Sequence, residues 1–277
     1  MIGGDLRAQA ERWIAGDPDE RDRAELRGLL GDGGEAAAAE LADRFAARLE
    51  FGTAGLRGAI GAGPNRMNRA VVRAATAALA GWLQAGHGGP GSARAGVVIG
   101  CDARHRSGEF ADEAARVLAG AGIRAHLLPP QQPTPLLAFA VRHLRAAAGI
   151  MITASHNPPA DNGYKLYLGD GAQIIPPVDK QIGTAIAELG DLSEIPVAPA
   201  DSPLIGRSGS ATTIARAAHV LAQASPVAST SPVTGIAVSR RLTLVNSGVM
   251  RAVRLARPVA YSQVAASSAV MITRFTV

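Results

Sequence analysis

Three short apolar runs, separated from one another by helix-length stretches, constrain the fold of this chain more than any other feature. They are residues 96–101 (Gly-Val-Val-Ile-Gly-Cys), 123–128 and 149–153 (Gly-Ile-Met-Ile-Thr). Runs of this length and composition are typical of strands that are buried on both faces of a sheet. Strands that alternate with helices of ten or more residues form βαβ units. We therefore expect an α/β fold with a mixed, largely parallel sheet and flanking helices.

Helical periodicity fills most of the segments between and around these runs. Two helices are expected within residues 6–50, where residues 17–19 (Asp-Pro-Asp) suit a turn and a helix start, and the second spans residues 36–49. Ser107 is expected to cap a helix that ends near residue 121. The remaining helices are predicted over residues 65–85, 133–144 and 178–189.

Glycine-rich segments predict two further β structures. Residues 51–63 contain five glycines among thirteen residues and indicate a strand interrupted by tight loops. Residues 164–168 and 172–175 are bounded by glycine-containing turn signals and predict a small hairpin. We expect this hairpin to lie at the edge of the sheet.

The composition changes near residue 195, and the net positive charge lies beyond that point. The whole chain carries a formal charge of +5 at pH 7, to which residues 201–277 contribute +7 and the preceding residues −2. Helix caps and oppositely charged pairs also become rare, so local cues no longer agree with one another. We interpret residues 196–277 as a truncated or non-native tail, with the start of a second folded domain as the alternative.

Composition and charge also exclude several classes of protein. A single cysteine, Cys101, allows no disulfide within the chain and favours a cytoplasmic location. No run of eighteen apolar residues is present, and the charged N-terminus does not resemble a secretory signal, so we expect no membrane association. Residues 1–200 show no basic face interleaved with aromatic residues, which argues against nucleic-acid binding. Binding of nucleic acid by the Arg-bearing tail remains a lesser alternative.

The first motif with chemical content is residues 153–158 (Thr-Ala-Ser-His-Asn-Pro), directly after a predicted buried strand. In open parallel sheets, ligands bind beyond the carboxyl ends of the strands, so Ser155 is expected where a hydroxyl can meet a substrate. Taken alone, the motif is equally compatible with a surface turn. Ser155 and His156 do not indicate a serine hydrolase, because adjacent side chains seldom face each other and no Gly-x-Ser-x-Gly elbow is present.

Two other stretches supply cations. Lys165 follows Ser155 by ten residues, and a returning hairpin would bring its ammonium towards the hydroxyl as a charge clamp and proton carrier. Residues 51–58 (Phe-Gly-Thr-Ala-Gly-Leu-Arg-Gly) combine glycines, whose N–H groups can approach an anion, with the bidentate guanidinium of Arg57. The Gly-Lys-Ser/Thr ending of a P-loop is absent, which argues against a nucleoside triphosphatase. In isolation, these stretches are also compatible with a solvated lysine and a glycine-rich turn.

Together, and in this order, the three stretches resemble the α-D-phosphohexomutase family of phosphoglucomutases and phosphomannomutases. Residues 153–158 match the family's phosphoserine loop, and residues 51–58 are similar to its bacterial phosphoglucomutase and phosphopentomutase-like branch. Further similarities lie at Trp13 with residues 17–19, residues 63–68, residues 102–104 with Ser107, residues 133–135 and residues 170–174. The resemblance covers residues 10–195. It implies an N-terminal helical extension over residues 1–50 and domain I of the family over residues 51–195.

The resemblance also implies an isomerase of carbohydrate metabolism, an intramolecular phosphotransferase that interconverts sugar 1-phosphates and 6-phosphates. Ser155 would carry the phosphoryl group and exchange it with the sugar through a sugar 1,6-bisphosphate. Arg57, His156 and Lys165 would balance charge and help to move protons. Substrate and phosphate binding would fall to Thr53, Gly55, Arg57, Asn157 and Lys165.

Three parts of the family pattern are absent from this chain. They are the Asp-Gly-Asp-x-Asp-Arg loop that holds Mg²⁺, the sugar-selecting loop and the C-terminal phosphate-binding loop. Of the metal ligands only Ser155 remains, through its phosphoryl group, and Mg²⁺ binds weakly without carboxylates. We therefore expect a truncated and inactive form, with a non-catalytic fragment that binds a phospho-ligand or a partner as the alternative. The sequence leaves open whether the sugar phosphate is a hexose or a pentose, and the oligomeric state.

Overall fold

The computed structural model describes residues 2–53, 55–207, 241–246 and 249–254, which fall into two compact units, Met1–Ala218 and His219–Val277. The helices of the first unit are α1 (Gly4–Gly16), α2 (Glu20–Gly31), α3 (Glu35–Phe45), α4 (Arg69–Gln84), α5 (Ser92–Ala95), α6 (Ser107–Gly120), α7 (Thr134–His143), α8 (Val178–Ala187) and the 3₁₀ helix η1 (Leu192–Glu194). Its strands are β1 (Leu56–Ala59), β2 (Val97–Cys101), β3 (Ala125–Leu127), β4 (Ala148–Ile152), β5 (Asp161–Leu168) and β6 (Ile205–Arg207). In the second unit, β7 (Arg241–Asn246) and β8 (Val249–Arg254) form an antiparallel pair. No helix within these ranges is long and apolar enough to cross a membrane.

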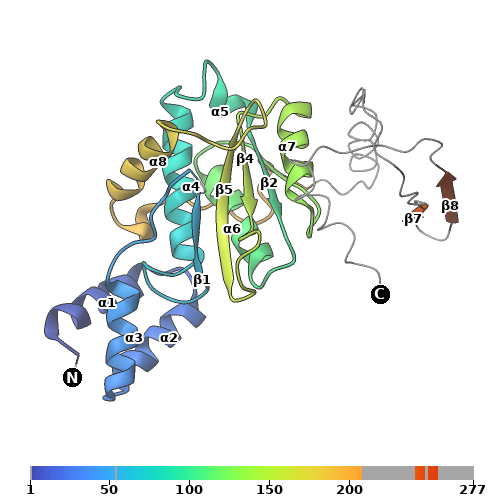
Figure 1. Cartoon of the computed structure of the whole chain (residues 1–277). Helices are drawn as coiled ribbons and strands as arrows, with labels where there is room; N and C mark the ends of the chain where they lie inside the picture. The colour runs from blue at the N-terminus through green and yellow to red at the C-terminus, as the bar shows by residue number, and fades with distance from the viewer. Residues whose placement is uncertain (1, 54, 208–240, 247–248, 255–277) are drawn as a thin grey trace, which may run out of the picture. The chain divides into compact units, whose positions relative to one another are not determined.

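The strands of the first unit form one mixed sheet in the order β1-β5-β4-β2-β3-β6. Neighbours from β4 through β2 and β3 to β6 run parallel, whereas β5 is antiparallel to both β1 and β4. Figure 1 shows α7 on the opposite side of the sheet from α4 and α8. The predicted α/β class, with a mixed and largely parallel sheet between helices, is confirmed.

Alternating side chains of the buried strands separate the core into two layers. Every residue of β2 and β4 is buried. Ile99 and Ile150 pack with α4, α6 and α8 on one face, while Val98 and Met151 pack with α7 on the other. Because successive side chains of a strand point to opposite faces, a continuous apolar run is required wherever helices cover both sides. The two best-defined apolar runs of the sequence therefore form the centre of the sheet.

The predicted hairpin of residues 164–168 and 172–175 forms, but its first strand does not lie at the edge of the sheet. Residues 161–168 form β5, which lies between β1 and β4. The following segment pairs with the end of β5 through an antiparallel bridge between Tyr167 and Gln173 and through the amides of Leu168 and Ile174, which donate to the carbonyls of Ala172 and Leu166 at 3.0 and 3.1 Å. β5 reaches this position because Gly163 lets its neighbours approach closely. A Cβ at Gly163 would lie 2.6 Å from the carbonyl oxygen of Leu56 and 2.7 Å from that of Thr153. The Asn-Gly pair thus permits close strand pairing on both sides instead of a turn.

The N-terminal extension contains three helices where two were expected. The third, α3, ends at Phe45, before the predicted end at residue 49, because the following segment turns back along residues 63–65. The amide of Leu49 donates to the carbonyl of Pro64, and the amide of Asn65 donates to the carbonyl of Arg44. These long-range bonds replace the helical ones that would continue α3.

The expected cap of α6 also differs in the structure. Arg106, with φ of 60°, occupies the N-cap position, and Ser107 is the first helical residue. The Arg106 guanidinium bonds to Asp22 at 2.7 Å and to Asp19 at 2.5 Å, which joins α6 to α2. Ser107 instead donates its hydroxyl to Asp102 at 2.8 Å.

The sheet extends past residue 195. Arg116 of α6 donates from Nε to the carbonyl of Ala198 at 2.8 Å, and the amide of Ala198 donates back to the carbonyl of Arg116. The chain then forms β6, which pairs in parallel with β3. Residues 196–207 therefore belong to the first unit. Apart from these residues and the β7–β8 pair, the segment interpreted as a tail lies outside the described residues.

Candidate active site

Ser155 lies in the loop that follows β4, at the carboxyl end of that strand. It is half-buried and has φ of 59°, in the left-handed region. This conformation costs a residue with a side chain about 1–2 kcal/mol, so the surrounding contacts must hold it in place. One contact is local, because the Ser155 amide donates to Oγ1 of Thr153 at 2.9 Å. The structure thus places the serine at the end of the sheet where the sequence predicted it.

The guanidinium of Arg104 holds this loop by four hydrogen bonds to backbone carbonyls. Nη2 donates to Ser155 and Asn157 at 2.9 Å each, and Nη1 donates to Pro158 at 2.7 Å and to Asp161 at 3.1 Å. A planar group with several donors can satisfy converging carbonyls that a single ammonium cannot. Arg104 therefore determines the path of the loop that contains the serine.

A buried polar network holds Arg104 in turn. Asp102 pairs with Nε of Arg104 at 3.2 Å and accepts the hydroxyl of Ser107 at 2.8 Å. Asn162, fully buried, donates to the same hydroxyl at 2.9 Å and to the carbonyl of His105. Sequence reasoning found no functional signal for Asn162, because Asn-Gly is also a turn signal. Asp102 carried a detectable one, since it follows a buried strand at its carboxyl end.

Strand register brings Arg57 and Lys165 together. Arg57 pairs with Gly163, and Lys165 lies two residues further along β5, opposite Met151 of β4. Residues that are paired or two apart point to the same face, so both cations lie on the face that α7 covers. The amide of Thr153, at the start of the serine loop, bonds to the carbonyl of Gly163. The two predicted cations therefore lie on the strands next to that loop.

These cations lie in an environment that suits an anion. Lys165 is buried, and burial lowers the pKa of its ammonium, as does the nearby charge of Arg57; Asp102 acts in the opposite direction. Within the part of the chain that the structure describes, Arg57 Nε is buried without a hydrogen-bond partner. Burying positive charge without a counter-charge is unfavourable. A bound phosphate would supply that counter-charge.

The other predicted site residues differ in their exposure and in their hydrogen bonds. His156 is exposed at the loop tip, and Asn157 donates from Nδ2 to Asp161 at 2.9 Å inside the loop. Thr53 is exposed, and its carbonyl accepts from Gln173 at 2.7 Å.

Gly55 has a structural requirement of its own. Its φ is +76°, and a Cβ there would lie 1.9 Å from the carbonyl oxygen of Tyr164. Its amide donates to the carbonyl of Gly52 at 2.8 Å. In this structure Gly55 therefore forms a tight turn against β5, and its N–H is already bonded.

The described residues do not fit a magnesium site. No group of three or more His, Cys, Asp or Glu side chains that could hold a metal ion occurs among them. Asp102, the carboxylate nearest to the cations in the network above, is already bonded to Arg104 and Ser107. Because Mg²⁺ prefers several oxygen ligands in octahedral geometry, this set supplies too few.

Comparison with known proteins agrees with this geometry. The sequence profile of the family described as "Phosphoglucomutase/phosphomannomutase, alpha/beta/alpha domain I" matches residues 48–192. The phosphopentomutase of Homo sapiens is 40% identical over 195 residues, which are 68% of this chain and 31% of that protein. The phosphoglucomutase of Staphylococcus haemolyticus is 41% identical over 151 residues, covering 54% of this chain and 27% of that protein.

A third relative is the phosphoribomutase of Saccharomyces cerevisiae, which is 46% identical over 150 residues, 53% of this chain and 24% of that protein. The matched region thus spans less than a third of the length of these relatives. The domain I profile, by contrast, covers more than half of this chain and includes both β1 and the serine loop. The chain therefore belongs to the phosphoglucomutase/phosphomannomutase family, of which it contains the region of domain I.

Proposed function

We propose that this chain carries the phosphoserine domain of a sugar-phosphate mutase, with Ser155 as the residue that bears the transferable phosphoryl group. One observation carries the proposal: the Ser155 loop, held by Arg104, lies next to strands that present the buried Lys165 and the half-buried Arg57. Relatives named phosphopentomutase, phosphoglucomutase and phosphoribomutase support this chemistry. The proposed substrate is accordingly a hexose or pentose monophosphate, and the proposed location is the cytoplasm.

In the proposed reaction, a sugar hydroxyl oxygen attacks the phosphorus of phosphorylated Ser155 while the bond from phosphorus to Oγ breaks. The attacking hydroxyl loses its proton and the departing Oγ gains one, so two proton transfers accompany the step. Arg57 and Lys165 neutralise the charge on the phosphoryl oxygens, which is the main requirement of phosphoryl transfer. The lowered pKa of Lys165 makes its ammonium a better proton donor to Oγ. The reverse step returns the other phosphate of the bisphosphate to Ser155.

His156, Thr53 and Asn157 are proposed to contact the phosphate or the sugar from the loop tip and from the turn before β1. Gly55 is proposed to contribute through the turn that it forms. Mg²⁺ and a sugar 1,6-bisphosphate are proposed as cofactor and activator of the full-length protein. The phosphoryl group of Ser155 would provide one metal ligand, and carboxylates would have to come from outside the described residues.

Intact-mass analysis of the full chain after incubation with glucose 1,6-bisphosphate tests the proposal. We expect the mass of one phosphoryl group to be added, and the addition to be lost in Ser155→Ala. Ser193→Ala removes a serine in η1 and is the matched control, in which labelling stays at the native level. Equal labelling of the native chain and Ser155→Ala would place the phosphate elsewhere and refute the assignment.

The second candidate function is binding of a phospho-ligand without transfer. The absence of a group of side chains that could hold a metal ion among the described residues favours it, because phosphoryl transfer in this chemistry needs charge neutralisation beyond two cations. Calorimetric titration with the bisphosphate separates the two functions. Binding that is weakened in Arg57→Met, with no phosphate found on Ser155, would support binding alone.

A further inference from the structure

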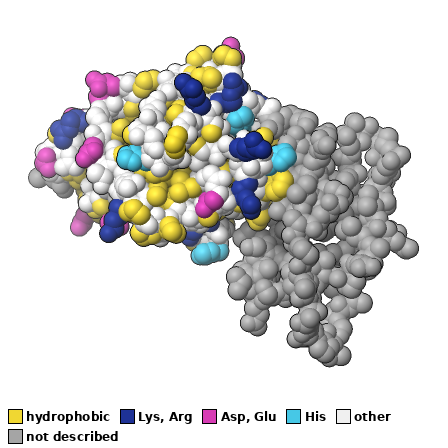
Figure 2. All heavy atoms as spheres, turned by 90° about the horizontal axis from the view of Figure 1, so that it is seen from above, with side chains coloured by type: hydrophobic (Ala, Val, Ile, Leu, Met, Phe, Trp, Pro, Cys, Tyr) yellow, Lys and Arg dark blue, Asp and Glu magenta, His cyan; other side chains and the backbone are white. Residues whose placement is uncertain are grey.

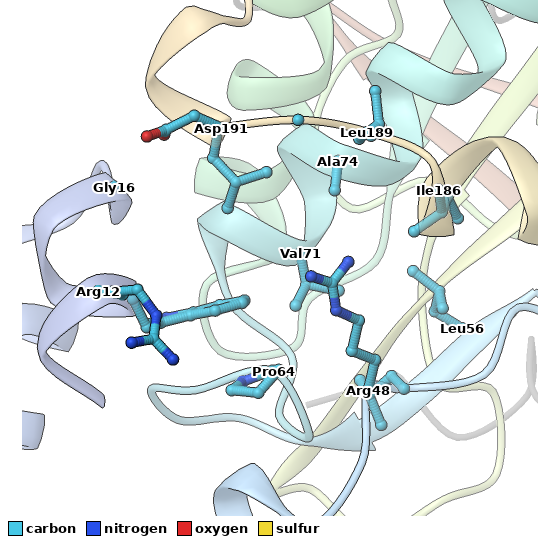
Figure 3. Close-up of a pocket in the computed structure, with 14 residues that line it drawn as sticks. Arg12, Gly16, Arg48, Leu56, Pro64, Val71, Ala74, Ile186, Leu189 and Asp191 are labelled. Carbon is cyan, nitrogen blue, oxygen red and sulfur yellow. The ribbon is translucent and has the colours of Figure 1, made fainter. Parts of the chain in front are cut away.

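A cavity lies apart from the Ser155 loop. It encloses about 220 Å³, and its walls come from α1, the segment after α3, β1, α4, α8 and η1. Figure 3 shows it between the N-terminal helix that carries Arg12 and the strand that carries Leu56. None of the residues assigned above to phosphate binding lines it. A ligand of this cavity would therefore be distinct from the phosphate proposed at Ser155.

The walls of this cavity are apolar and held in place. Trp13 is fixed by a hydrogen bond from Nε1 to Asp17 at 3.0 Å and by edge-on contact with Phe45, at 6.4 Å between ring centroids. Leu56 and Val71 contribute from β1 and α4. A flat aromatic wall and branched aliphatic groups favour a hydrocarbon body over a sugar, because a sugar would leave hydroxyls without partners.

Two arginines line the same cavity, and both are visible in Figure 3. Arg12 comes from α1 and Arg48 from the segment after α3, so two separate elements bring positive charge to one place. Neighbouring carboxylates are engaged elsewhere: Glu11 pairs with Arg7 at 3.8 Å, and Asp17 bonds to Trp13. Within the described ranges, neither Arg12 nor Arg48 has an ion-pair partner.

Asp191 is the acidic residue in the lining, and its carboxylate is used for another purpose. It accepts from the amide and the hydroxyl of Ser193, at 2.8 Å each, and so caps η1. Figure 3 shows its carboxylate turned away from the guanidinium of Arg48. The charge presented to the cavity is therefore positive.

We propose that this cavity binds a small organic anion with an apolar body, of the size of a medium-chain carboxylate. The acid group would pair with Arg48 and Arg12, and the hydrocarbon would lie against Trp13, Leu56 and Val71. An apolar cavity of about 150 Å³ accommodates benzene, so about 220 Å³ suits a chain of roughly six to eight carbons. The proposal is independent of phosphoryl transfer at Ser155.

Equilibrium dialysis of the full chain against radiolabelled octanoate and 1-octanol tests the proposal. Because both ligands contain eight carbons and differ only in the end group, the difference between their affinities measures the contribution of the arginines. We expect octanoate to bind about ten times more tightly at low salt, and the difference to shrink as salt is added. In the double variant Arg12→Met/Arg48→Met, the two ligands should bind equally. Arg124→Met removes an exposed arginine that does not line the cavity, and it should leave the preference intact.

A filling variant locates the binding. Ala74 lines the cavity from α4, and Ala74→Phe is expected to abolish binding of both ligands. Circular dichroism establishes whether the variant is folded; if it is not, Leu189→Trp, from the segment after α8, replaces it. Equal affinity of the native chain for octanoate and 1-octanol would overturn the proposal. Undiminished octanoate binding in a folded filling variant would overturn it as well.

Discussion

Lys165 lies in surroundings that disfavour its charge. It is buried on the sheet face, close to Arg57, and only Asp102 offsets the positive charge. Burial, the larger cause, and Arg57 both lower its pKa below the ordinary 10.5. Below that value the unfolded chain binds the proton more readily than the folded one does, so the charged lysine reduces stability at neutral pH. This arrangement is expected of an anion-binding site whose ligand is not bound.

Replacing Lys165 by methionine should therefore raise the melting temperature at pH 7 and slow phosphorylation of Ser155 by about 100-fold. The difference in stability between Lys165→Met and the native chain should narrow as the pH rises towards 10.5, where the lysine loses its proton in both the folded and the unfolded state. Thermal unfolding at several pH values and timed intact-mass measurements provide the two readouts. Lys180→Met, at an exposed position of α8, should change neither. A less stable Lys165→Met at pH 7 would contradict the electrostatic argument.

Arg104 acts on the serine loop through geometry, not only through charge. Arg104→Lys keeps the charge but cannot donate to four carbonyls at once. We expect a loss of roughly 1–3 kcal/mol in the free energy of unfolding and a fall of about ten-fold or more in Ser155 phosphorylation. Hydrogen exchange should increase in residues 154–161 and stay unchanged in β2. A variant with native exchange in the loop would exclude the positioning role.

At the scale of elements, buried carboxylates join the N-terminal helices to the sheet domain. Asp19 and Asp22 of this cluster bond to Arg106 at the start of α6. Asp17 lies at the end of α1 and accepts from the amide of Asp19 and from Trp13. Burial, assisted by the charge of Asp22, raises the pKa of Asp17 from 3.8 to about 6 and outweighs these hydrogen bonds. The junction between α1 and α2 is therefore sensitive to pH.

This raised pKa predicts how stability changes with pH. Between pH 3.8 and about 6 the folded state holds the proton of Asp17 and the unfolded chain releases it, so stability falls as the pH rises. Relative to Asp17→Asn, the native chain should lose roughly 2 kcal/mol from pH 4 to pH 7. Denaturant titrations at intervals of half a pH unit measure the difference. Asp5→Asn, on the exposed surface of α1, is the control, and curves that stay parallel for Asp17→Asn would contradict the prediction.

At the scale of the whole molecule, two features bear on the expected activity: the distribution of surface charge and the share of its relatives that the chain matches. Figure 2 shows basic and acidic side chains dispersed among neutral ones on one face of the described residues, without a continuous basic surface there. The region that matches relatives spans less than a third of their length. The described residues hold a serine and cations but no group of three or more His, Cys, Asp or Glu side chains that could hold a metal ion. We therefore expect phosphorylation of Ser155 and complete mutase turnover to be separable properties.

We accordingly expect the purified chain, supplied with Mg²⁺ and the bisphosphate, not to convert glucose 1-phosphate or ribose 1-phosphate at a measurable rate. Enzymes of ordinary efficiency turn over about 1–1,000 times per second, so a coupled assay detects even a small residual activity. The same preparation should still accept phosphate on Ser155. Turnover at an ordinary rate would show that the chain supplies its own metal and sugar sites.

The central strands, the position of Ser155 and the family could be predicted because their signals are local. The apolar runs that became β2 and β4 encode burial on both faces, and the loop after β4 follows from chain order. The same local reasoning placed the hairpin of residues 164–168 and 172–175 at the sheet edge, because Asn162-Gly163 has the same appearance in a turn and in a close strand pairing. Only the neighbours of Gly163 distinguish the two cases.

The sequence by itself therefore determined the central strands, their alternation with helices and the candidate serine and its two cations. The tertiary structure decided that β5 lies inside the sheet, that Arg104 binds the serine loop and that Arg12 and Arg48 share a cavity. The physical reason is the distance along the chain over which each kind of signal acts. Periodicity and turn chemistry act over a few residues, whereas Arg57 and Gly163 become neighbours only when strands distant in the chain pair, and side-chain contacts at such distances leave no local pattern.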